Sequence, residues 1–82
     1  MPTARQENRE LTFGEKAVGL NFNPANNKDV QKVKVAYAAI IDQLNEARSA
    51  SDNQEAKRLY SVAITEAQGA QMWAVKAVTW VL

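Results

Sequence analysis

The fold is decided by residues 54–82, QEAKRLYSVAITEAQGAQMWAVKAVTWVL. Small and apolar residues recur in this stretch at alternating spacings of four and three, which is typical of a helix that packs against another helix. The residues of this seam are Ala56, Tyr60, Ala63, Ala67, Ala70, Ala74, Ala77 and Val81. Because most of them are alanine, two backbones can approach closely. The pattern therefore predicts a tight antiparallel hairpin or a close contact between subunits.

The partner of this helix is predicted over residues 28–48, with Asn26 or Asn27 as its N-cap and Asp29 in its first turn. Its apolar residues recur at helical spacing. They are Val30, Val33, Tyr37, Ile40, Ile41, Leu44 and Ala47. This pattern predicts one apolar face that packs against the long helix.

A polar connection of about five residues follows, and Asp52 with Glu55 has the spacing of an N-cap and its partner. The long helix is therefore predicted over residues 53–81. A connection this short places the two helices antiparallel. Gly69 weakens the long helix by about 1 kcal/mol relative to alanine, so we expect it to allow the close approach of another backbone.

The chain before the hairpin is predicted to contain a mobile arm over residues 1–11 and a short helix over residues 12–19. Thr12 and Glu15 have capping-box spacing, and Gly19 ends the short helix. We therefore predict an all-α fold, a single helical-hairpin domain over residues 1–82 with a short N-terminal helix.

The composition excludes several classes of function. The 82 residues include no cysteine and no histidine, so disulfides, thiolate and imidazole catalysis and the usual zinc sites are excluded. A chain this short usually needs a staple, a metal or a partner, which leaves assembly into a homo-oligomer. The net charge of +1 and the absence of a long apolar run predict no binding to duplex DNA or RNA and no membrane partner. We expect a soluble cytosolic protein.

Arg58, Ser61 and Thr65 form the most informative polar set. Their spacing of i, i+3 and i+7 places them on one helix face. A guanidinium and two hydroxyls on a rigid element can hold phosphate oxygens. The alternative is an ordinary solvated face that carries an arginine.

Phe22, Asn23 and Pro24 form a second set with Lys34 or Lys32. The proline and asparagines around the aromatic predict an extended segment and a turn. Such an aromatic can stack on a nucleobase while a nearby lysine meets a phosphate. The alternative is that the ring fills the end of the core and the lysines only contribute solubility.

The C-terminal apolar residues fall on more than one helix face, which a two-helix hairpin cannot cover. They are Met72, Trp73, Val75, Val78, Trp80, Val81 and Leu82. We therefore expect homo-oligomerisation through this half. The carboxylates Asp42, Glu46, Glu55 and Glu66 sit as they do on ordinary helix surfaces, so the sequence predicts no catalytic residue, no metal site, no cofactor and no enzyme.

The sequence resembles the phage anti-CBASS and Thoeris anti-defence hairpin family, whose members act as sponges for cyclic oligonucleotide immune signals. The resemblance covers residues 20–80. The matching features are Arg58, Ser61, Ala63 and Thr65, then Ala70 with Met72-Trp73-Ala74, and upstream Phe22 and Pro24 followed by Val33-Lys34.

The resemblance implies a hexamer of interlocked dimers that holds cyclic dinucleotides between protomers and cyclic trinucleotides in separate pockets. Phe22 would stack on a base and Lys34 would meet a phosphate of the dinucleotide. Arg58, with Ser61 and Thr65, would serve the trinucleotide pocket. Binding without cleavage, in the cytoplasm of the infected bacterial host, is the implied activity. A helical-hairpin oligomer that acts as a protein-binding adaptor is the rival hypothesis, and a nucleotide-degrading enzyme is the third.

Overall fold

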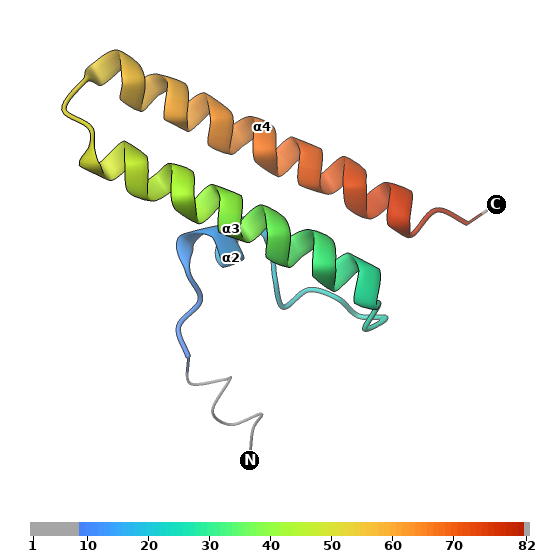
Figure 1. Ribbon diagram of the computed structural model, residues 1–82. Helices are drawn as coiled ribbons and strands as arrows, with labels where there is room; N and C mark the ends of the chain where they lie inside the picture. The colour runs from blue at the N-terminus through green and yellow to red at the C-terminus, as the bar shows by residue number, and fades with distance from the viewer. Residues whose placement is uncertain (1–8, 82) are drawn as a thin grey trace.

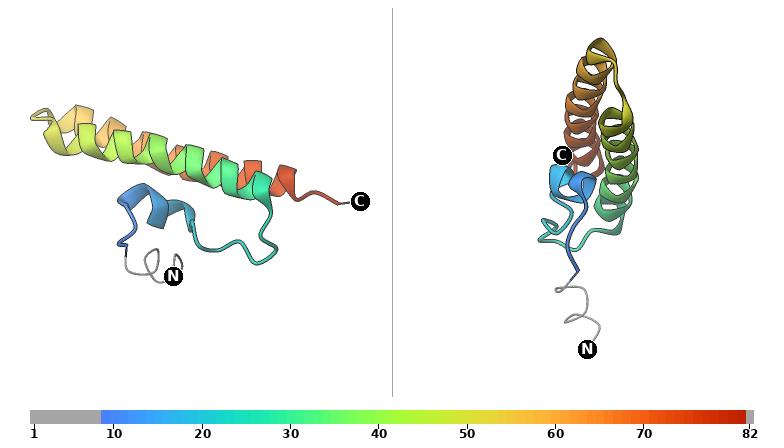
Figure 2. Two further views of the ribbon diagram at one scale, coloured as in Figure 1. Left: turned by 60° about the horizontal axis from the view of Figure 1, so that its bottom comes forward. Right: turned by 90° about the vertical axis from the view of Figure 1, so that its left-hand side faces the viewer.

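The computed structural model describes residues 9–81, which form three helices and no strand, so the predicted all-α class is confirmed for this range. The helices are α2 (Phe13–Val18), α3 (Lys28–Ala50) and α4 (Gln54–Val78). α3 and α4 lie antiparallel and side by side, and α2 packs against α3 (Figure 1). Figure 2 shows that α2 and the loop after it lie together on one face of the hairpin.

Local capping explains where the helices begin and end. Thr12 and Glu15 form the predicted capping box, and Gly19 ends α2 in the left-handed region at φ 63°. The Asn27 side chain accepts hydrogen bonds from the N–H groups of the first turn of α3, so Asn27 rather than Asn26 is the cap. The prediction of Asp52 as the cap of α4 was wrong. The cap is Asn53, whose side-chain oxygen accepts from the Ala56 N–H at 2.8 Å.

The long helix ends at Val78, three residues before the predicted end at residue 81. The Thr79 N–H and hydroxyl both donate to the Val75 carbonyl, at 3.0 and 2.7 Å, and the next N–H, that of Trp80, donates to the Ala77 carbonyl at 3.2 Å in a tighter turn that ends the α-helical pattern. Trp80 and Val81 follow outside the helix with poor helix propensity.

The core lies where α2, the loop after it, α3 and α4 meet. Its buried apolar side chains are Val18, Leu20, Ala38, Ile41 and Ile64. The predicted seam of α4 is shifted, because Ile64 and Gln71 are the buried residues of this helix while Ala70 and Ala77 are exposed. Ile64 packs against the same cluster as Ile41, the most deeply buried side chain described. A branched apolar residue removes more surface from water than an alanine does, so it sets which face turns inward.

A close approach of backbones occurs at Gly14, not at Gly69. A Cβ on Gly14 would lie 2.1 Å from the Ala38 carbonyl oxygen, whereas a Cβ on Gly69 would meet nothing within 4 Å. The expectation for Gly69 was therefore wrong within the described chain. Asp42 secures the same contact, because its carboxylate accepts from the Gly14 N–H and from the Thr12 hydroxyl, each at 2.7 Å. Asp42 is therefore a tertiary cap of α2 rather than an ordinary surface acid.

Most of the predicted mobile arm, residues 1–8, lies outside the described residues. The part that is described is attached to the fold. Arg9 donates to both oxygens of Glu15, at 3.0 and 3.3 Å, and Leu11 packs against the core cluster. Residues 9–11 therefore belong to the folded domain.

The Glu15 carboxylate should make the free energy of unfolding depend on pH in the acid range. Hydrogen bonds from the Arg9 guanidinium and then from the Thr12 N–H lower its pKa from the ordinary value of 4.5. As the pH falls, Glu15 therefore takes up a proton in the unfolded chain before it does so in the folded protein. The contribution of the ionised carboxylate to the free energy of unfolding is present above pH 4.5 and is lost as the pH falls through the lowered pKa. Glu15→Gln should cost about 1 kcal/mol at neutral pH and remove that part of the acid dependence.

Urea unfolding of wild type and variant, at neutral pH and at about pH 3, checks this expectation. The two proteins should differ at neutral pH and converge in acid. A difference that stays constant with pH would contradict the role given to the ionised carboxylate.

Candidate ligand-binding site

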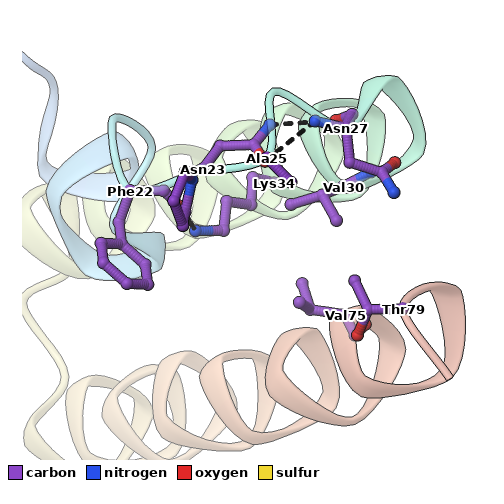
Figure 3. A pocket seen from close by; sticks show the side chains of 9 residues that line it. Phe22, Asn23, Ala25, Asn27, Val30, Lys34, Val75 and Thr79 are labelled. Atoms are coloured by element: carbon purple, nitrogen blue, oxygen red, sulfur yellow. Dashed lines mark hydrogen bonds between the residues drawn. The ribbon is translucent and has the colours of Figure 1, made fainter. Parts of the chain in front are cut away.

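A hollow of about 230 Å³ lies between the loop after α2 and the last turns of α4 (Figure 3). We call it the first hollow. It is lined by Phe22, Asn23, Pro24, Ala25, Asn27, Val30, Lys34, Val75 and Thr79. The second predicted set therefore surrounds one hollow, with Lys34 as its lysine. Lys32 is exposed and lies at a different part of the surface of α3.

The Phe22 side chain stands at this hollow rather than in the core. It is 74% exposed, so the alternative that it fills the end of the core does not hold for this chain. Its ring centroid lies 5.5 Å from the Lys34 ammonium, within the range of a cation–π contact. An uncovered aromatic face beside a positive charge is suited to a flat, anionic partner.

Lys34 is buried although it carries a charge, with only 5% of the residue exposed. Its ammonium donates to the Gly19 carbonyl at 2.9 Å and to the Phe22 carbonyl at 2.5 Å. An ammonium has three N–H donors, so these two carbonyls leave one donor for another acceptor. The alternative that this lysine only contributes solubility is therefore excluded, because its head group is tied to the loop.

The loop that presents Phe22 is held by its own asparagines. The Asn23 side chain donates to the Asn27 carbonyl at 2.9 Å and accepts from the Asn27 N–H at 3.1 Å. Asn26 adopts the left-handed region at φ 53°, which asparagine tolerates better than most residues. The side chain of Asn23 is therefore used by the loop itself, and Pro24 provides an exposed apolar wall of the hollow.

The first predicted set lies elsewhere. Arg58, Ser61 and Thr65 line a shallow hollow of about 360 Å³ on α4, together with Val62 and Glu66. The three side chains share a face as their spacing predicts. Arg58 lies in the second turn of α4 and Val75 of the first hollow lies near its end, so at 1.5 Å per residue these two residues are separated by roughly 25 Å along the helix.

Two of these polar groups already have partners. Arg58 donates to both oxygens of Glu55, at 3.1 and 2.6 Å, and Ser61 accepts from Arg48 at 2.9 Å. The hydrogen bonds of the exposed pair lower the pKa of Glu55 and raise the pKa of Arg58. Because this pair is open to water, exchange of Glu55 for a phosphate would cost little.

The sequence did not single out several residues that matter at these hollows. Thr79 comes from the far end of α4. It lines the same hollow as Phe22 only because α3 and α4 are antiparallel. Gln71 lines neither of these two hollows, but it is buried, with 5% exposed, although the alanine pattern predicted that another face of α4 turns inward. The predicted antiparallel hairpin could have indicated that Val75 and Thr79 lie close to the loop after α2.

Large apolar side chains remain exposed at the C-terminal end. Met72, Trp73, Trp80 and Val81 are between 58% and 89% exposed, and Leu82 lies outside the described residues. Lys76 lies 5.3 Å from the Trp73 ring centroid. Exposed apolar patches of this kind are typical of interaction surfaces.

Within residues 9–81 no group of three or more acidic, histidine or cysteine side chains is placed to hold a metal ion. No helix in the same range is long and apolar enough to cross a bilayer.

The fold and the first hollow together define a small helical hairpin that presents an aromatic ring and a buried ammonium at one surface. Residues 15–79 match the family model described as Acb2/Tad1, hairpin domain. Because the match spans most of the chain, the protein belongs to this family of anti-CBASS and anti-Thoeris sponges, and the resemblance noted in the sequence is confirmed. Comparison with curated proteins and with solved structures gave no match.

Proposed function

We propose that this protein binds and sequesters cyclic oligonucleotide immune signals without cleaving them. The observation that carries the proposal is the exposed Phe22 ring beside the Lys34 ammonium, which two backbone carbonyls hold in place, in a chain of the Acb2/Tad1 hairpin family. Sequestration needs only affinity and copy number, because lowering the free signal below an effector's Kd silences that effector by mass action.

The first hollow supplies the two interactions that a cyclic nucleotide needs. A base stacks on the Phe22 ring, which is worth about 1–3 kcal/mol. A phosphate oxygen accepts the third N–H of Lys34 in a charge-assisted hydrogen bond. The two carbonyls that already hold this ammonium fix its position before the ligand arrives, so little side-chain entropy is lost on binding.

Assembly of copies completes the site in this proposal. A hollow of about 230 Å³ is smaller than the 300–1,000 Å³ typical of sites that enclose a whole ligand. A second protomer covering the exposed Trp73 and Trp80 side chains would bury apolar surface, and we propose that the assembly also encloses the first hollow. A homo-hexamer in the cytoplasm of the infected bacterial host is the assembly we propose, with no duplex nucleic acid and no membrane as partner.

The hollow with Arg58, Ser61 and Thr65 is proposed as a second site that takes cyclic trinucleotides. Arg58→Ala should weaken binding of a cyclic trinucleotide by about tenfold, because one charge-assisted contact to phosphate is lost. Binding of cyclic dinucleotides should stay unchanged, since the first hollow is near the other end of α4. Isothermal titration with both ligands checks the expectation.

Lys57→Ala is the matched control, because it removes the same charge from the neighbouring position. Glu55→Gln should have the opposite effect to Arg58→Ala, since it frees the guanidinium. Equal trinucleotide binding by Arg58→Ala and wild type would contradict the assignment of this site.

The second candidate function is a protein-binding adaptor with no small ligand. The observation that favours it is the exposed patch of Met72, Trp73 and Trp80. A nucleotide-degrading enzyme is the third candidate function.

Thermal unfolding with and without ligand separates the first two functions. A sponge at a ligand concentration a hundredfold above its Kd should gain about 2.7 kcal/mol of stability, with a clear rise in Tm. An adaptor should show no shift with any cyclic nucleotide. Unchanged Tm across a panel of cyclic di- and trinucleotides would therefore overturn the proposed function.

A further inference from the structure

Gln71 is the one buried polar side chain besides Lys34 in the described range, and only 5% of the residue is exposed. Lys34 uses its buried head group on two carbonyls. The Gln71 amide, in contrast, makes no hydrogen bond within residues 9–81. In this range every side-chain N or O atom that water cannot reach has a hydrogen-bond partner. The small exposed part of Gln71 therefore includes its amide end.

Gln71 lines a further hollow of about 420 Å³, which we call the second hollow. The second hollow lies between the C-terminal end of α2, at Lys16 and Gly19, and α4, at Gln71 and Met72. It shares Lys34 and Val75 with the first hollow. The Lys34 ammonium contacts the carbonyl of Gly19 at one hollow and that of Phe22 at the other, so the two hollows adjoin across this lysine.

We propose that Gln71 is a specificity-determining residue, which reads the edge of a nucleobase that enters the second hollow. The inference rests on the proposed function. A phosphate at Lys34 lies between the two hollows, so a ligand with one base on Phe22 directs its other base toward Gln71. Because only 5% of Gln71 is exposed, its amide meets little water, and a base edge supplies the hydrogen-bond partners that residues 9–81 do not.

When a base presents its N7 edge to Gln71, the chemistry of the amide selects adenine. A glutamine side chain presents one donor and one acceptor side by side, which matches adenine N7 as the acceptor and the N6 amino group as the donor. On the corresponding edge guanine presents two acceptors, N7 and O6, so only half of the bidentate contact can form. Adenine in the second hollow is therefore the preferred base.

The test compares binding of cyclic di-AMP and cyclic di-GMP to wild type and to Gln71→Met by isothermal titration. Methionine keeps the length of the side chain and removes both hydrogen-bonding groups. Wild type should prefer cyclic di-AMP, and Gln71→Met should reduce that preference by about tenfold. The ratio of the two Kd values is the readout, because it does not depend on the fraction of protein that is active.

Gln68→Met is the matched control, since Gln68 lies one turn earlier on α4 and lines neither hollow. It should leave the ratio at the wild-type value. An unchanged ratio in Gln71→Met, with or without a change in oligomeric state, would overturn the inference while the proposed function stands. Failure of wild type to bind any cyclic nucleotide would overturn both.

Discussion

Lys34→Met should lower the affinity for cyclic dinucleotides by roughly a hundredfold. The substitution removes the ammonium that we propose as the phosphate partner, and a hydrogen bond to a charged group is worth about 1.5–3 kcal/mol. It also removes the side-chain donor to the Phe22 carbonyl and one of the two donors to the Gly19 carbonyl, which keeps the Phe22 N–H at 2.9 Å, so the loop that presents the Phe22 ring is held less firmly. Both effects act in the same direction, and isothermal titration measures their sum.

Two further variants separate recognition from folding. Lys32→Met removes the same charge from an exposed position of α3 and should bind like wild type. Phe22→Ala should weaken binding by about tenfold through lost stacking, and it should unfold like wild type because the ring contributes little to the core. Wild-type affinity in Lys34→Met, or an unfolded Phe22→Ala, would contradict the site.

Gly14→Ala should destabilise the fold by about 3 kcal/mol. The added Cβ would lie 2.1 Å from the Ala38 carbonyl oxygen, which belongs to the backbone of α3 and cannot turn away. α2 would have to shift, and the hydrogen bonds that Asp42 accepts from Thr12 and Gly14 would lengthen or break. Overpacking and the loss of charge-assisted bonds each cost about 1–3 kcal/mol.

Urea unfolding measures this effect, and Gly69→Ala is the matched control. Nothing lies within 4 Å of a Cβ on Gly69, so alanine there should stabilise the helix by up to about 1 kcal/mol. Wild-type stability in Gly14→Ala would contradict the packing of α2 on α3. A loss of stability in Gly69→Ala would show that a second copy covers that position.

Features of the fold that depend on residues close together in the sequence could be predicted from the sequence. The capping box at Thr12 and the left-handed Gly19 follow from local hydrogen bonding, so α2 was found with its caps. Asn53 was missed as the cap of α4 because Asp52 has the same capping chemistry one position earlier. The choice between them depends on how the chain leaves α3.

Tertiary contacts could not be predicted in the same way. Two glycines within helices differ only in what another element brings to them, and only Gly14 meets a backbone. The spacing of Asp42 is that of a surface acid, and its role as a cap of α2 depends on packing between α2 and α3. The short connection before α4 predicted the antiparallel hairpin, but the alanine pattern did not reveal that Ile64 and Gln71 face inward.

In the candidate site, too, local features could be predicted and tertiary contacts could not. Phe22, Pro24 and Lys34 are close in sequence, so an aromatic and a lysine at one hollow could be anticipated. The burial of Lys34 could not, because it depends on the turn that aims two carbonyls at the ammonium. Val75 and Thr79 come from the far end of the hairpin and enter the site only through the fold.

The central claim is reversible capture of a cyclic nucleotide, and recovery of the ligand tests it most directly. Purified protein is incubated with cyclic dinucleotides, cyclic trinucleotides and cyclic ADP-ribose isomers, filtered, and then digested with protease before chromatography. At least one ligand should disappear from the filtrate and return unchanged after digestion. Ligands that all stay in the filtrate, or one that returns as a cleaved product, would contradict sequestration.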